Sequence, residues 1–137
     1  MPGRLSLLVL AFAAVAGCAA VSKGEERLLE ETLESYSAVI RWGNFDEAVS
    51  FVDPETIKAH PVSALDLQRY HQVQVTAYNE QPLRHVGDHE VQQAVEIGLV
   101  NVNTQAARSV IDRQHWRFDE KAKHWWLVSG LPDITAH

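Results

Sequence analysis

The hydrophobic pattern of this chain changes from a helical period to a period of two near residue 70, and this change constrains the fold more than any other feature. Before it, Leu29, Leu33, Tyr36 and Ile40 recur at spacings that put them on one face of a helix. After it, apolar and polar residues alternate, as in strands with one buried face. Helices followed by adjacent strands predict an α+β domain with N-terminal helices packed on one face of an antiparallel sheet.

Local signals place the first two helices. The first is expected from Glu25 to the Trp42-Gly43 pair, because glycine is common where a chain leaves a helix. Asn44 with Glu47 three residues later is the pattern of a capped helix start, so a second helix should follow at once. Its expected buried side consists of Phe45, Ala48, Val49 and Val52.

Two shorter helices are expected before the strands. Asp53 and Pro54 predict a helix start with proline in the first turn, and Pro61 prevents that helix from continuing. Ser63 with Asp66 indicates a further short helical turn.

Four strands are expected after Gln68. They are a strand in which His71, Val73, Val75 and Ala77 alternate with Tyr70, Gln72, Gln74, Thr76 and Tyr78; a strand through Val91, Val95, Ile97 and Leu99; a strand over 106–118; and a strand over 124–129. Gly98 is expected to mark a bulge or bend. The polar stretch 119–123 should connect the last two strands as a hairpin, and Pro132 should end the last one.

The first residues have the properties of an export signal. Arg4 precedes an apolar stretch, Leu5 to Ala16, that is interrupted only by Ser6. As a helix, roughly 13 residues rise about 20 Å, which is too short to span about 30 Å of bilayer hydrocarbon. Ala14-Val15-Ala16 also fits the cleavage pattern of ordinary secreted proteins, so a soluble secreted product is the alternative.

The run Val15-Ala16-Gly17-Cys18 resembles the lipobox of bacterial lipoprotein signal peptides. The resemblance implies a signal peptide over 1–17, lipidation of Cys18, a tether over 18–24 and a single domain over 25–137. The acylated Cys18 would hold the protein at a membrane. Ala19, in place of aspartate, implies by the same resemblance an outer-membrane location, with the domain facing the periplasm.

The mature part resembles the NTF2-like (cystatin-like α+β) superfamily. The resemblance rests on the leading amphipathic helix, the second helix opening Gly43-Asn44-Phe45-Asp46-Glu47-Ala48, and a terminal hairpin built from 116–118 and 124–128. It implies a cone in which a curved sheet wraps around the helices. Members of the superfamily include isomerases, dehydratases, ligand carriers and assembly modules, so the fold does not select one function.

Composition excludes some partners. The net charge of −6 disfavours binding to phosphate backbones, so no nucleic-acid partner is expected. Cys18 is the only cysteine, so no disulfide is expected and the fold must be held by its core.

The candidate chemistry is sparse. Asp112 shares a strand parity with Val110 and Trp116, so it is expected to point inward, where burial would raise its pKa and suit a general base. The alternatives are a pairing with an arginine of a neighbouring strand, or a bulge that turns Asp112 to solvent. Tyr36, Tyr70 and Tyr78 are candidate hydrogen-bond donors beside it.

Histidines raise the question of a metal. His85 and His89 could clasp a metal on a helix, but Gly87 between them favours a turn. His60, His71, His115 and His124 are scattered over separate elements. No metal, cofactor or catalytic residue is therefore assigned.

Tryptophans suggest a contact surface. Trp125 and Trp126 must point to opposite faces of the sheet, so one of them is covered by other segments, such as residues 131–137, or is left exposed. An exposed tryptophan would suit a protein partner or a homodimer through the sheet face. We favour a non-enzymatic envelope lipoprotein that binds a small apolar ligand or a protein partner. The alternative is a small periplasmic isomerase or dehydratase with an acid/base site in the cone.

Overall fold

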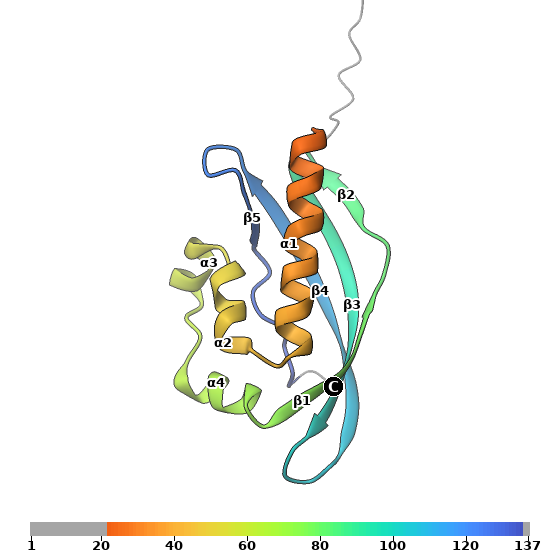
Figure 1. Cartoon of the computed structure of the whole chain (residues 1–137). Coiled ribbons are helices and arrows are strands. Elements are labelled where there is room, and N and C mark those ends of the chain that lie inside the picture. Colours follow the sequence, from red (N-terminus) through yellow and green to blue (C-terminus); the bar gives the residue numbers. More distant parts are fainter. Residues whose placement is uncertain (1–21, 136–137) are drawn as a thin grey trace, which may run out of the picture.

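The computed structural model describes residues 22–135, which form helices packed against one curled antiparallel sheet (Figure 1). In chain order the helices are α1 (Lys23–Arg41), α2 (Phe45–Ala48), the 3-10 turn η1 (Val49–Phe51), α3 (Pro54–Ala59) and α4 (Ala64–Tyr70). The strands are β1 (Val73–Glu80), β2 (Arg84–Gly87), β3 (Glu90–Asn101), β4 (Ala107–Asp119) and β5 (His124–Leu127). The α+β fold predicted from the sequence is confirmed.

The sheet has the strand order β1-β3-β4-β5, and every neighbouring pair is antiparallel. The short strand β2, which the sequence did not predict, pairs with the first residues of β3, whereas β1 pairs with its second half. Helix α1 lies along the inner face of the sheet, and α2, α3 and α4 lie beside it (Figure 1). The helices therefore leave the outer face of β3 and β4 uncovered.

Helix α1 forms as its pattern predicts. Its buried side chains include Leu29, Leu33, Tyr36 and Ile40, which cover the inner face of the sheet. The helix begins two residues before Glu25, because Ser22 caps it by accepting a hydrogen bond from the Glu25 amide. It ends at Arg41, after which Gly43 takes a positive φ of 70°.

The caps of the short helices follow the predicted pattern with one exception. The Asn44 side chain caps α2 by accepting from the Glu47 amide, and Ser63 and Asp66 form a complete capping box on α4. Asp53 precedes α3 as expected, but its side chain makes no cap bond; one oxygen instead pairs with Arg117 at 3.4 Å. Of the expected buried side of the second helix, Val49 is only partly buried.

The predicted start of the first strand is wrong. Residues 69 and 70 continue α4, and β1 begins at Val73. Tertiary contacts hold Tyr70 in the helix: its ring stacks on Phe45 at 4.4 Å, and its hydroxyl donates to the Pro132 carbonyl. Tyr70 therefore belongs to α4, although its place in the alternating sequence pattern predicted a strand.

A bulge in β1 reverses the predicted side-chain direction of its second half. The register with β3 shifts between Val75 and Ala77, so Tyr78 points inward and is 7% exposed. Gly98 pairs with Ala77, and a Cβ at that position would lie 2.7 Å from Thr76 Oγ1. Gly98 thus marks the bulge as predicted, although the extra residue belongs to the neighbouring strand.

The terminal hairpin of β4 and β5 closes the core. Val110, Trp116 and Phe118 point inward from β4, as predicted. Trp125 is fully buried, whereas Trp126 is half-buried on the outer face, so the two tryptophans do lie on opposite faces. The expected last strand is shorter than predicted and ends at Leu127.

Candidate functional site

Five side chains form a polar cluster inside the sheet, which we call the interior cluster: Tyr36, Tyr78, Asp112, Gln114 and Trp116. Gln114 connects its members. Its Nε2 donates to Tyr78 Oη at 2.9 Å and to Asp112 Oδ2 at 2.9 Å, and its Oε1 accepts from Trp116 Nε1 at 3.1 Å. The inward direction predicted for Asp112 is confirmed. Its hydrogen-bond partner is Gln114 rather than an arginine, and the pairing of β3 with β4 has no bulge at this position.

Burial perturbs the acid–base properties of the interior cluster. Desolvation raises the pKa of Asp112 to about 6, and the hydrogen bond from Gln114 only partly opposes this shift. Burial, followed by the nearby Asp112 charge, raises the pKa of Tyr36 well above its ordinary value, and the Tyr36 hydroxyl has no hydrogen-bond partner. A carboxylate with such a pKa beside a phenol has the chemistry of a general acid–base pair.

Access to the interior cluster is restricted. Asp112 retains 7% of its surface and Gln114 only 1%. Tyr36 and Trp116 are fully buried and meet edge to face, with ring centroids 5.2 Å apart. The Asp112 carboxylate is therefore nearly closed to solvent and to a substrate.

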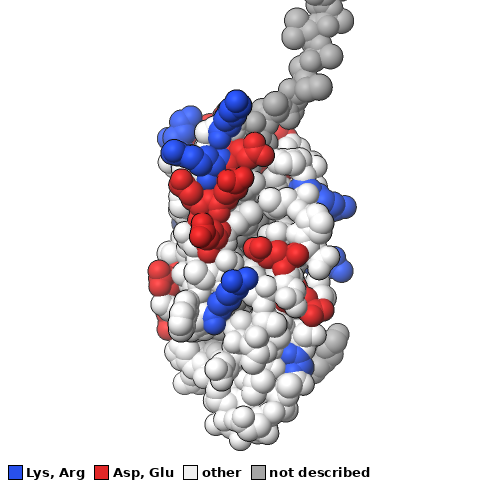
Figure 2. All heavy atoms as spheres, turned by 45° about the vertical axis from the view of Figure 1, so that its right-hand side comes forward, with Lys and Arg blue, Asp and Glu red and all other residues white. Residues whose placement is uncertain are grey.

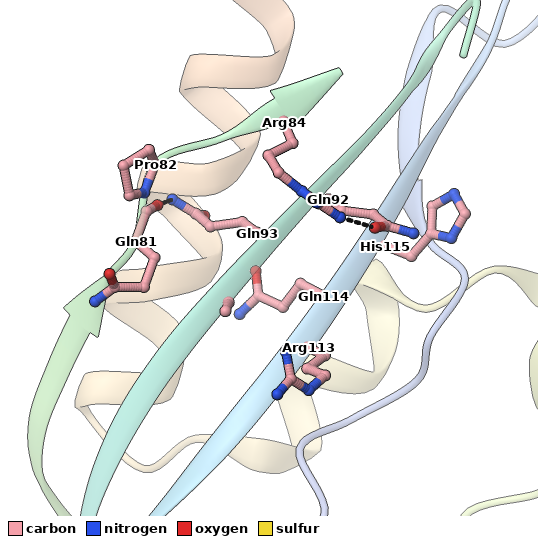
Figure 3. A pocket seen from close by; sticks show the side chains of 9 residues that line it. Gln81, Pro82, Arg84, Gln92, Gln93, Arg113, Gln114 and His115 are labelled. Atoms are coloured by element: carbon pink, nitrogen blue, oxygen red, sulfur yellow. Dashed lines mark hydrogen bonds between the residues drawn. The ribbon is translucent and has the colours of Figure 1, made fainter. Parts of the chain in front are cut away.

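A second feature is a hollow of about 560 Å³ on the outer face, which we call the sheet-face hollow (Figure 3). It is lined by Gln81, Pro82, Arg84, Gln92, Gln93, Ala94, Arg113, Gln114 and His115. Arg84, Gln92 and His115 form one row across β2, β3 and β4, and Ala94 and Arg113 form the next row. The hollow exists because the small Ala94 follows the longer Gln92 on the same face of β3.

The lining of the sheet-face hollow contains two arginines and no aspartate or glutamate. Arg84 is held in place by its Nη2, which donates to Gln92 Oε1 at 3.0 Å. Figure 2 shows acidic side chains in the upper half of the molecule, with Lys and Arg side chains beside them, and α1 alone exposes Glu26, Glu30, Glu31 and Glu34. The hollow is therefore a basic region on an acidic domain.

A third cluster links the start of α1 to two turns of the sheet. His89 Nδ1 lies 2.8 Å from Glu25 Oε2, and His89 Nε2 lies 3.2 Å from Glu120 Oε1. The three side chains offer ligand atoms within 4.8 Å of one another, so they are the group that could hold a metal ion among residues 22–135. Since both ring nitrogens already face carboxylates, the geometry matches an imidazolium clamped between two anions.

The structure separates the other residues considered from the sequence. His85 lies in β2 and His89 in the turn after it, with a positive φ of 64°, so the two histidines do not form a helical pair. Tyr70 is bonded to the Pro132 carbonyl rather than to Asp112. Cys18 lies outside the described residues.

Sequence reasoning missed Gln114, Arg84 and Arg113. Gln114 follows Asp112 on the same strand parity, so the parity argument could have found it. Arg113 has the opposite parity and so lies on the outer face, whereas the candidate residue predicted on this strand, Asp112, points inward. Arg84 had no signal, since β2 was not predicted as a strand.

No family model, curated protein or solved structure matched this chain in the comparisons. Among the helices within residues 22–135, none combines the length and the hydrophobicity needed to cross a bilayer.

Proposed function

We propose that this protein is a non-enzymatic bacterial envelope lipoprotein, anchored through an acylated Cys18 to the outer membrane, whose periplasm-facing domain binds a partner or ligand on the outer face of its sheet. The observation that supports the proposed binding is the difference between the inner and outer faces of the sheet. The inner face is filled by the protein's own side chains, whereas the outer face carries the sheet-face hollow.

The packing of the cone disfavours an apolar ligand inside it. The largest fully buried side chains are Trp116, Trp125, Tyr36 and Phe45, which occupy the space between α1 and the sheet. Interiors packed in this way leave few voids larger than a water molecule. Most of the residues that line the sheet-face hollow carry polar groups, which argues for an occupant with polar groups of its own.

An acid–base enzyme of the isomerase or dehydratase type is the second candidate. The observation in its favour is Asp112, whose pKa of about 6 suits a general base near neutral pH. The enclosure of Asp112 argues against it, because a general base must come within hydrogen-bond reach of the substrate.

The NTF2-like resemblance supports this proposal only at the level of the fold. A homodimer through the sheet face belongs to the same proposal. That face exposes Ile111, which is 52% exposed, among mainly polar neighbours, so a small, polar contact fits it better than a large apolar one.

Acrylamide quenching of tryptophan fluorescence tests whether small molecules enter the cone. A chain carrying Trp42→Phe and Trp126→Phe keeps only the two fully buried tryptophans, Trp116 and Trp125. We expect its quenching constant to fall well below that of a Trp116→Phe chain, which retains Trp42 at 88% exposure. Equal quenching in the two chains would favour an open pocket and the enzyme.

The anchor is tested separately by Cys18→Ser. We expect loss of acylation in mass spectrometry and accumulation of the unprocessed precursor, because the thiol is the acyl acceptor that the lipobox resemblance implies. Unchanged processing and membrane fractionation would contradict the anchoring part of the proposal.

A further inference from the structure

We propose that the sheet-face hollow is a binding site for a small oxyanion, a carboxylate or phosphate group. This inference rests on the proposed binding function and names the chemistry of the ligand. It depends on Arg84 and Arg113, neither of which belongs to the interior cluster.

The two arginines stand on opposite sides of the hollow. Arg84 belongs to β2 and Arg113 to β4, with β3 and its Ala94 between them (Figure 3). Two interstrand spacings separate β2 from β4 by about 10 Å, so two long side chains can reach one group seated over Ala94. Guanidinium groups donate in a planar fork that matches carboxylate and phosphate oxygens.

The Arg113 guanidinium group is available to bind an anion. Within residues 22–135 its guanidinium takes part in no ion pair or hydrogen bond. Arg117, four residues further along the same strand face, is by contrast paired with Asp53 at 3.4 Å. Arg84 is preoriented by Gln92, which leaves its other guanidinium nitrogens free to donate to a ligand.

Gln93 lies between Gln92 and Ala94 on β3 but has the opposite, inward parity. Its side chain is 7% exposed and lines the hollow, and its Nε2 donates to the Gln81 carbonyl at 2.9 Å. Its Oε1 is buried without any hydrogen-bond partner. Because this oxygen is closed to solvent, a ligand in the hollow would contact the two arginines rather than Gln93.

Charge contrast supports specificity for this site. The chain carries a net charge of −6, so an anion is repelled by most of the surface and attracted where two arginines occur without carboxylates. A volume of about 560 Å³ falls within the range of small-molecule sites.

Isothermal titration calorimetry on the full chain in a neutral detergent tests the proposal. The probes are citrate, which carries a hydroxyl beside its carboxylates, inorganic phosphate, and monomeric dihexanoylphosphatidylglycerol. We expect saturable binding of at least one probe, weakened by added salt. Preference for the short-chain lipid would assign the oxyanion to a headgroup, and preference for citrate or phosphate would assign it to a soluble ligand.

Charge-matched variants locate the binding. Arg84→Gln and Arg113→Gln should each weaken binding by about tenfold or more, because each removes a charge-assisted contact. Arg27→Gln, which removes the same charge from the exposed side of α1, should leave the affinity unchanged. Both sheet variants should keep their melting temperatures within a few degrees, which excludes unfolding as the cause.

No saturable binding of any probe, or equal affinity in all three variants, would overturn the anion site. That outcome is distinguishable from a failure of the proposed function, which would appear as strong quenching of Trp116 and Trp125 or as unchanged processing of Cys18→Ser.

Discussion

Asp112 lies beneath α1, where burial opposes its negative charge. Its pKa is raised from an ordinary value near 4 to about 6, so the folded state binds a proton more tightly than the unfolded state. The carboxylate consequently favours folding at low pH, and this contribution is lost as the pH rises from about 4 through about 6. In a packed interior the ionised form of such a group lowers the stability of the folded state.

Asp112→Asn should therefore raise stability at pH 7 by up to about 3 kcal/mol, since one pKa unit corresponds to about 1.4 kcal/mol. The gain should shrink as the pH falls from 6 to 4, where the native carboxyl is already neutral. Melting temperatures across this range measure the effect, with the exposed Glu30→Gln as a matched control. A lower melting temperature at pH 7 than that of the unsubstituted chain would contradict the desolvation argument.

His89 is the opposite case, because the folded state favours its charged form rather than its neutral form. Hydrogen bonding to Glu25 raises its pKa, with further contributions from the charges of Glu25, Glu120 and Asp88. The clamp is complete below the unfolded pKa of about 6.5 and is lost as the pH rises through the higher folded value.

His89→Gln is thus expected to lower the melting temperature at pH 5.5 and to have little effect at pH 9. Glutamine keeps a donor for Glu25 but cannot carry a charge between two carboxylates. His85→Gln, on the exposed strand β2, serves as the control. An equal loss of stability at both pH values would mean that the imidazole contributes packing rather than charge.

The β4–β5 hairpin shows, at the scale of elements, how far alternation alone predicts packing. Trp125 packs against Phe118 with ring centroids 5.2 Å apart, and its indole nitrogen donates to the Glu25 carbonyl at 3.0 Å. Trp126 lies beside the His124 ring on the outer face, with centroids 4.1 Å apart. Adjacent residues on one strand therefore have different energetic roles.

Trp125→Ala should lower the free energy of unfolding by about 3–5 kcal/mol, the range for a buried aromatic side chain. Trp126→Ala should cost about 1 kcal/mol or less, because its half-buried position can refill with solvent. Chemical denaturation of the two variants measures the difference. Similar losses for both would be inconsistent with the observed faces of β5.

Helix positions and the parity of β4 could be predicted because their signals are local. Leu29, Leu33 and Tyr36 repeat at helical spacing, and Asp112 follows the parity of Val110. The β1 bulge could not be predicted, because it depends on the pairing of Ala77 with Gly98 across two strands. The sheet-face hollow was likewise hidden, since it requires β2, β3 and β4 to align Arg84 with Gln92 and His115.

In the whole molecule, the two faces of the sheet differ. Aromatic side chains pack the inner face and stabilise the fold, and the outer face carries the basic hollow that we propose as the binding site. The helices and the segment around Ile134 cover the inner face, and the lipid anchor proposed at Cys18 would leave the outer face free to meet ligands in the periplasm. The Arg84 side chain projects from the edge strand β2 and the Arg113 side chain from β4, so the ligand proposed for them needs no opening of the core.

Chemical-shift mapping of the isotope-labelled full chain in detergent, titrated with the calorimetry probe of highest affinity, tests most directly whether binding occurs outside the cone. We expect saturable shifts concentrated at the amides of Gln92, Ala94 and Arg113. Shifts concentrated at Tyr36 and Tyr78 instead, or no saturable shifts, would contradict a closed interior with its binding site on the outer face.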